Sequence, residues 1–97
     1  MNELQFTWDA QKAESNIQKH GISFEEAKSA FIDDNARLIY DPDHSQDEDR
    51  FILLGMSSYY HLLVVCHCYR ENDTIIRIIS ARKANKLEQK QYQEFLV

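Results

Sequence analysis

The 97-residue sequence has little cysteine, glycine or proline, and each scarcity excludes a class of protein. Its two cysteines cannot build the disulfide framework of a small secreted domain. Two glycines and one proline exclude collagen-like and linker-like chains. The sequence contains no apolar run near the ~20 residues that a membrane-spanning helix needs, and its start lacks the pattern of a signal peptide. We therefore expect a cytoplasmic protein without membrane attachment.

What the chain does contain is enough apolar material for one core. Hydrophobic residues make up 43% and aromatic residues 11% of the sequence, which argues against disorder. The length suits one domain over residues 1–97. The net charge of −5 is unevenly distributed along the chain. Residues 1–50 hold 12 acidic and 5 basic side chains, whereas residues 51–97 hold 4 acidic and 6 basic ones. This balance permits a small anion-binding site and argues against wide, nonspecific coating of nucleic acid.

Apolar periodicity and turn residues predict an α+β fold. Short connections between the later strands favour an antiparallel meander, on which two N-terminal helices and one C-terminal helix pack. Asp9 and Ser23 are suited to cap the first two helices, Glu26 completes a capping box, and Gly21 suits a helix end. We expect strands at residues 4–8, 37–40, 50–56, 62–69 and 75–81, and helices over 9–19, from 24 to 31, and after Arg82.

The helical spacing also predicts which side chains face the core. In the first helix the inward face is expected to hold Ala10, Ala13, Ile17 and His20. In the last helix it is expected to hold Ala84, Leu87, Tyr92 and Phe95.

The run Cys66-His67-Cys68 raises the question of a zinc site. On a strand the two thiols face one side and the imidazole faces the other, so the three do not converge on one ion. We therefore expect core cysteines and no metal.

Several motifs, in order and over residues 6 to 92, resemble the BrnT-type toxins. They are Phe6-Thr7-Trp8-Asp9, Lys12, Asn16, Lys19-His20-Gly21, Phe24-Glu25-Glu26-Ala27, Glu48-Asp49-Arg50 with Gly55, Arg77-Ile78-Ile79-Ser80-Ala81-Arg82-Lys83-Ala84, Glu88 and Tyr92. The resemblance implies a RelE-like fold and RNA cleavage by the toxin of a type II toxin–antitoxin pair. It also implies a BrnA-type ribbon-helix-helix antitoxin, a complex of two toxins with two antitoxins, and contact with operator DNA only through the antitoxin.

Cleavage of RNA without a metal needs a base for the 2′-hydroxyl, an acid for the leaving oxygen and cations around the phosphate. Imidazole and carboxylate groups suit proton transfer, and the guanidinium fork suits phosphate. On the family match, the predicted catalytic residues are His20, Glu48, Arg50, Arg77 and Arg82. The predicted RNA-binding residues are Lys19, Ser80, Lys83 and Tyr92, and no cofactor is expected.

Structural roles stay open for the same residues. His20 suits a partly buried histidine bonded to a backbone carbonyl, and Tyr92 suits the core. Glu48 and Arg50 suit a surface ion pair, and Arg77 suits a structural pairing with Glu48.

Two other functions also stay open: a catalytically inactive co-repressor that only binds the antitoxin, and a small metal- or redox-sensing domain. We expect the antitoxin to contact exposed sheet residues beside the basic cluster, with the acidic loop 41–49 at its rim.

Overall fold

Residues 4–96 are the part of the chain that the computed structural model describes. Within them no helix is both long and apolar enough to cross a bilayer. The elements in chain order are β1 (Gln5–Thr7), α1 (Ala10–His20), α2 (Phe24–Ala30), β2 (Arg37–Tyr40), the short 3₁₀ helix η1 (Pro42–His44), β3 (Phe51–Met56), β4 (Leu62–Arg70), β5 (Ile75–Lys83) and α3 (Lys86–Glu94).

The five strands form one sheet in the order β1-β5-β4-β3-β2. Strands β2 to β5 form the predicted antiparallel meander, and the predicted α+β class is confirmed. The first strand makes the sheet mixed, because β1 pairs in parallel with β5. Strand β5 lies at the edge of the meander, and β1, from the N-terminal part of the chain, extends the sheet beyond this edge.

Three helices begin at the residues that their capping chemistry selects. The Asp9 carboxylate accepts a hydrogen bond from the Lys12 N–H at 2.9 Å, as predicted for a helix start. Gly21 ends α1 with a φ of 71°, in the left-handed region that glycine adopts without strain. The Ser23 hydroxyl accepts from the Glu26 N–H at 3.0 Å.

The predicted capping box at the second helix is incomplete, because the Glu26 carboxylate binds groups on the β3–β4 turn instead. A complete capping box is found at α3, where Asn85 and Glu88 bond each other reciprocally.

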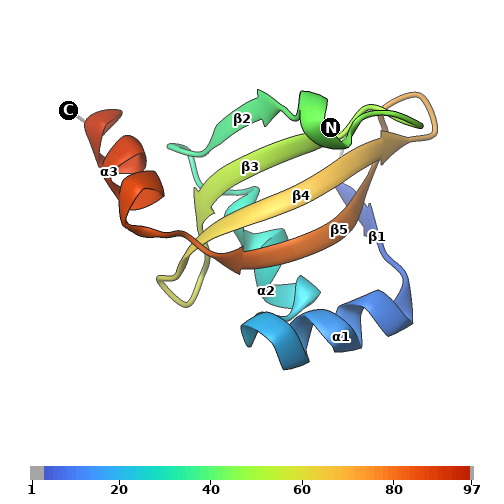
Figure 1. Ribbon diagram of the computed structural model, residues 1–97, viewed down its shortest axis with the longest axis horizontal. Helices are drawn as coiled ribbons and strands as arrows, with labels where there is room; N and C mark the ends of the chain where they lie inside the picture. Colours follow the sequence, from blue (N-terminus) through green and yellow to red (C-terminus); the bar gives the residue numbers. More distant parts are fainter. Residues whose placement is uncertain (1–3, 97) are drawn as a thin grey trace.

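The two faces of the sheet have different surroundings (Figure 1). In Figure 1, α2 lies behind the sheet and α1 lies beneath it, whereas α3 lies at one end. Ile22, Phe24 and Ala27 pack with Val65 and Ile78 in the core on this helix-bearing side. We call the opposite side of the sheet the open face.

Burial on α1 differs from the prediction. Asn16 is the buried residue of the helix, while Ile17 is 49% exposed and His20 is exposed. The physical reason lies in the sheet: β1 pairs only with residues 75–77 of β5, so the backbone edge further along β5 needs another partner. A polar side chain therefore takes the inward position on α1.

Burial on α3 differs as well. Tyr92 is buried as predicted, but Leu87 is 64% and Phe95 is 58% exposed. Ala84 is buried too, but it precedes the helix, because β5 continues to Lys83 and Asn85 caps α3. The helix touches the sheet only at one end, so most of its surface faces outward. Phe95 nevertheless lies against the Arg37 guanidinium, 3.0 Å from ring centroid to Cζ.

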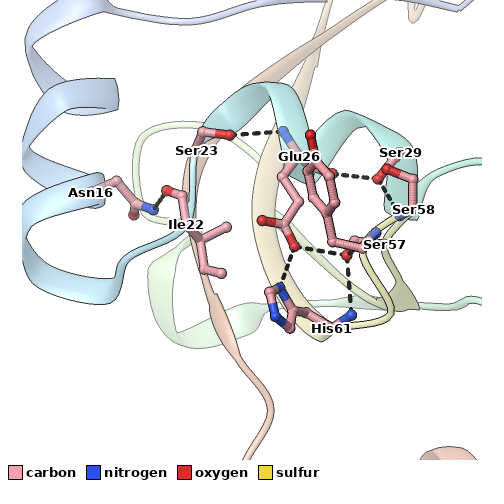
Figure 2. Close-up of polar contacts among 9 residues, drawn as sticks. Asn16, Ile22, Ser23, Glu26, Ser29, Ser57, Ser58 and His61 are labelled. Atoms are coloured by element: carbon pink, nitrogen blue, oxygen red, sulfur yellow. Dashed lines mark hydrogen bonds and ion pairs between the residues drawn. The ribbon is translucent and has the colours of Figure 1, made fainter.

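The Asn16 side chain ties α1 to the unpaired edge of β5. Its amide nitrogen donates to the Ala81 carbonyl at 2.7 Å and to the Ile22 carbonyl at 2.9 Å, the latter bond being visible in Figure 2. Its amide oxygen accepts from the Ala81 N–H at 3.1 Å. The side chain thus replaces the missing neighbouring strand at Ala81.

Replacing this amide should weaken the fold strongly. Asn16→Ala leaves the Ala81 N–H and two carbonyls without partners in a buried place, so we expect a loss of about 2–4 kcal/mol in the free energy of unfolding. Asn16→Asp should cost as much, because a carboxylate faces those carbonyls. Urea denaturation measures both, with the exposed Gln18→Ala on the same helix as control. An Asn16→Ala variant as stable as the control would contradict this role.

Candidate functional site

A bulge in β5 decides on which face its arginines lie. Arg77 and Arg82 are five positions apart, and on an unbroken strand this odd separation places two side chains on opposite faces. The ladder between β4 and β5 shifts register and leaves Ile79 as an extra residue in β5. As a result Arg77, Ser80 and Arg82 all lie on the open face.

The pairing partners on β4 confirm this placement. Arg77 lies opposite Cys68, Ser80 opposite Cys66, and Arg82 opposite Val64. These three β4 residues alternate along one strand, so they share a face, and directly paired residues project from the same side of a sheet.

The loop before β3 is held over the same face by its own hydrogen bonds. The Asp41 N–H donates to the Arg50 carbonyl at 2.9 Å. The Ser45 hydroxyl donates to the Asp41 carbonyl and accepts from the Arg50 N–H at 2.9 Å. Pro42–His44 form η1 between these anchors. These hydrogen bonds attach the loop to the start of β3 and hold its side chains over the open face.

Within this loop, the His44 imidazole contacts the Asp41 carboxylate. His44 Nδ1 lies 2.8 Å from Asp41 Oδ2. The Asp41 residue is only 7% exposed, and its other oxygen accepts from the Asp43 N–H at 3.2 Å. The carboxylate is thus buried and fully engaged, whereas the His44 side chain is 67% exposed.

This pair and two of the predicted arginines border one hollow of about 240 Å³ on the open face. Its chemically active lining is His44, Asp41, Arg50, Ser80 and Arg82. Arg50 Nε is shielded from solvent and has no hydrogen-bond partner within residues 4–96. The hollow therefore combines two guanidinium groups, an imidazole and a hydroxyl.

Arg82 is held in place by Glu88 of α3. Its two terminal nitrogens donate to the two carboxylate oxygens at 2.8 and 2.9 Å, a bidentate fork. The hydrogen bonds from Arg82 keep the pKa of Glu88 below its ordinary value, and those to Glu88 raise the pKa of Arg82. Both groups stay charged, and α3 fixes the guanidinium at the edge of the hollow.

Glu48 pairs with a different arginine from the one that its sequence position suggests. Its carboxylate lies 2.9 Å from Arg70 of β4, and not in an ion pair with Arg50 or Arg77. Hydrogen bonds from the Cys68 thiol and from Arg70 lower the pKa of Glu48. A carboxylate so stabilised is a weak base. The adjoining hollow of about 480 Å³ also holds Asp49 and Asp73, whose charge disfavours phosphate.

His20 and Lys19 do not line this hollow. Both are exposed at the last turn of α1, which packs on β5 from the helix-bearing side. The structure therefore brings Arg50, Arg77, Arg82 and Ser80 to one face, while it leaves the predicted imidazole on the helix-bearing side.

Lys83 and Tyr92 border a second hollow, of about 410 Å³, between α3 and the β3–β4 turn. Tyr92 is buried and its hydroxyl donates to Asp33 Oδ2 at 2.5 Å, so it has the core role that the sequence left open. Lys83 is exposed there.

The remaining two histidines have structural surroundings. Figure 2 shows the His61 ring against Glu26, with Nδ1 2.7 Å from Oε2, and the Ser57 hydroxyl donating to the same oxygen at 2.7 Å. This cluster fastens the β3–β4 turn to α2. His67 is fully buried among aromatic rings, and burial lowers its pKa, so it is a neutral core group.

The predicted orientation of the cysteine run is confirmed. His67 lies on the helix-bearing side against Phe31, and Cys66 and Cys68 lie on the open face. Burial raises the pKa of both thiols, which keeps them protonated and unreactive.

Comparison with known proteins decides the family. Residues 8–88 match the family model described as the ribonuclease toxin, BrnT, of type II toxin–antitoxin systems. The chain belongs to the BrnT toxin family. A crystal structure of the ribonuclease toxin BrnT from Brucella abortus has the same fold, with a TM-score of 0.65 and 21% sequence identity over 87% of this chain and 100% of that one. No curated protein matches the sequence.

The family resemblance found on the sequence motifs is therefore confirmed, and with it a partner antitoxin at the level of the family. The residues that sequence reasoning missed in this BrnT-family chain are His44 and Asp41. The signal was the run Asp41-Pro42-Asp43-His44-Ser45, in which a proline-initiated turn returns the imidazole to the carboxylate three residues earlier.

The Tyr92–Asp33 bond gives a stability prediction with a defined pH dependence. Burial and the bond to Asp33 raise the pKa of Tyr92 to about 12, so folding favours the neutral phenol. This stabilisation is fully present below the ordinary tyrosine pKa near 10 and is lost as the pH rises through about 12. Tyr92→Phe should cost about 2 kcal/mol at pH 7.

The difference between wild type and Tyr92→Phe should shrink above pH 10, which chemical denaturation at pH 7 to 11.5 measures. The exposed Tyr59→Phe is the matched control and should leave the pH profile unchanged. A constant difference across this range would contradict the assignment.

Proposed function

We propose that this BrnT-family protein is an endoribonuclease that cleaves RNA by metal-independent acid–base chemistry on the open face. The observation that carries the proposal is the gathering of Arg50, Arg77 and Arg82, from two distant segments, on one side of the sheet. Arg50 and Arg82 border the same hollow, and Arg50 Nε has hydrogen-bonding capacity that no protein group uses within residues 4–96.

The arginines supply what the reaction needs most. Attack of a 2′-hydroxyl on the neighbouring phosphate develops extra negative charge on the phosphoryl oxygens, and pre-oriented cations stabilise that charge better than mobile water does. A guanidinium remains charged when a bound strand excludes solvent. Arg82 is already oriented by Glu88, so little ordering is needed when a phosphate enters.

The supporting residues fall into two groups. Ser80 lines the hollow and suits a hydrogen bond to a phosphate oxygen. Lys83 borders the second hollow beside α3 and remains a candidate for contact with RNA outside the first hollow. Glu48 acts through its neighbours, because it holds Arg70 and sits beside Cys68. Lys19 and His20 lie on α1 and remain candidates for contact with a longer RNA.

Removing the arginines should lower the cleavage rate. We expect Arg50→Ala, Arg77→Ala and Arg82→Ala each to reduce cleavage of a single-stranded RNA about 100-fold or more, since each removes a preorganised charge. Lys86→Ala and Lys90→Ala on the exposed part of α3 are charge-matched controls and should stay within about twofold. Rates of fluorescent oligonucleotide cleavage measure the effect, with thermal unfolding as a check on folding.

Chelation is part of the same assay. Cleavage should persist in EDTA, because cationic side chains take the place of a metal ion. Activity that EDTA abolishes would contradict the metal-independent part, and absence of cleavage by wild type would favour an inactive co-repressor of the same fold.

We further propose that the partner is a BrnA-type antitoxin that covers the open face, with the acidic loop 41–49 at the rim of the contact. Neutralisation follows directly if the partner occupies the hollow that the RNA phosphate needs. Basic groups of the partner would meet Asp43, Asp47 and Asp49, which are exposed on this loop.

Competition tests this docking. Adding purified antitoxin should abolish cleavage at one equivalent, and Asp47→Lys should weaken antitoxin binding at least tenfold, measured by calorimetry, because it sets like charges against each other at the contact. Glu14→Lys on the exposed side of α1 is the control for charge change alone. A complex in which hydrogen exchange protects α1 and α2 and leaves loop 41–49 exposed would contradict the proposal.

A further inference from the structure

We propose that His44, oriented by Asp41, is the general base of the RNA cleavage proposed above, on which this inference rests. The family description names a ribonuclease toxin and assigns no residue. Of the four histidines, His44 is the one that lines the hollow containing Arg50 and Arg82.

The geometry sets which nitrogen is available. Asp41 Oδ2 lies 2.8 Å from His44 Nδ1, and a carboxylate at this distance accepts the Nδ1–H. In the neutral ring the lone pair then resides on Nε2, which has no hydrogen-bond partner within residues 4–96. A carboxylate-oriented imidazole with a free nitrogen is the arrangement that general bases use.

The surroundings keep this arrangement in place before substrate binds. Asp41 is 7% exposed and bonded through its side chain to the Asp43 N–H, and its backbone is fixed to Arg50 and Ser45. The His44 ring itself is mostly exposed, so a strand of RNA can reach it. In the pair of Asp41 and His44, the carboxylate is therefore held in place and the imidazole is accessible to solvent.

The other titratable groups nearby are less suited to the task. Glu48 is stabilised as a carboxylate by Cys68 and Arg70 and is therefore a weak base. Glu88 is occupied by both terminal nitrogens of Arg82. His61 is tied to Glu26 in the cluster that fastens the β3–β4 turn, at the opposite end of β3 from the 41–50 loop.

The step balances as an internal transphosphorylation. His44 Nε2 takes the proton of the 2′-hydroxyl while the 2′-oxygen forms a bond to phosphorus. The bond between phosphorus and the 5′-oxygen breaks, and the departing oxygen takes a proton from water. The hydroxide so formed takes the proton from His44 Nε2, which restores the neutral ring. The products are a 2′,3′-cyclic phosphate and a 5′-hydroxyl end, and no oxidant or cofactor enters.

The test compares His44→Ala with Tyr59→Ala, which truncates an exposed ring on the β3–β4 turn, on two substrates. The first is a mixed-sequence single-stranded RNA, and the second carries sulfur in place of the bridging 5′-oxygen at one site, a leaving group that needs no proton. A general base is needed for both substrates, so His44→Ala should lose about 100-fold or more on each. Free imidazole should restore part of the activity to this variant, and Tyr59→Ala should keep wild-type rates.

Asp41→Asn tests whether Asp41 orients the His44 ring. The measurement is the position of the ring proton, which a purely structural role of Asp41 would leave unchanged. Nitrogen NMR of the wild-type His44 ring should show the proton on Nδ1. The asparagine amide can donate to Nδ1, so the variant should shift the proton toward Nε2 and lose activity with it. An unchanged ring tautomer in this variant would overturn the role of Asp41.

Each remaining outcome is decisive. Full activity of His44→Ala beside an active wild type overturns this inference and leaves the ribonuclease proposal standing. Recovery of His44→Ala on the sulfur substrate alone assigns His44 as an acid and overturns the base. A wild type that cuts neither substrate overturns both proposals.

Discussion

The site depends on one extra residue in β5. Side chains alternate strictly along a strand, so a change of register by one residue moves every following side chain to the other face. The bulge at Ile79 makes this change between Arg77 and Arg82. Without it, the sheet would either bury Arg82 among core residues or turn Ala81 away from them. With it, Ile78 and Ala81 remain in the core while the arginines share the open face.

The same strand explains why α1 carries a buried asparagine. Beyond residue 77 no strand of residues 4–96 lies beside this edge of β5, and Asn16 supplies donor and acceptor to Ala81 in place of one. The same segment of β5 therefore carries the arginines on the open face and the Ala81 backbone that Asn16 binds.

The open face is assembled from pieces that are each fixed locally. The 41–50 loop is closed by Asp41, Ser45 and Arg50, and Arg82 is held by a carboxylate from α3. Preorganisation of this kind lowers the ordering cost when a charged ligand binds. It also separates the histidines by role, since two of them serve the fold and one is presented beside two guanidinium groups.

The sequence determined the α+β class, the antiparallel meander, the starts of the first two helices and the family, because these follow from local periodicity, capping chemistry and short motifs. It could not determine the parallel addition of β1, the inward position of Asn16 or the partner of Glu48, because each depends on which edges and charges lie nearby after folding. Nor could it show which of the four histidines lies beside Arg50 and Arg82. That choice belonged to the tertiary structure, since a bulge and a closed loop, rather than sequence spacing, set the distance between His44 and the arginines.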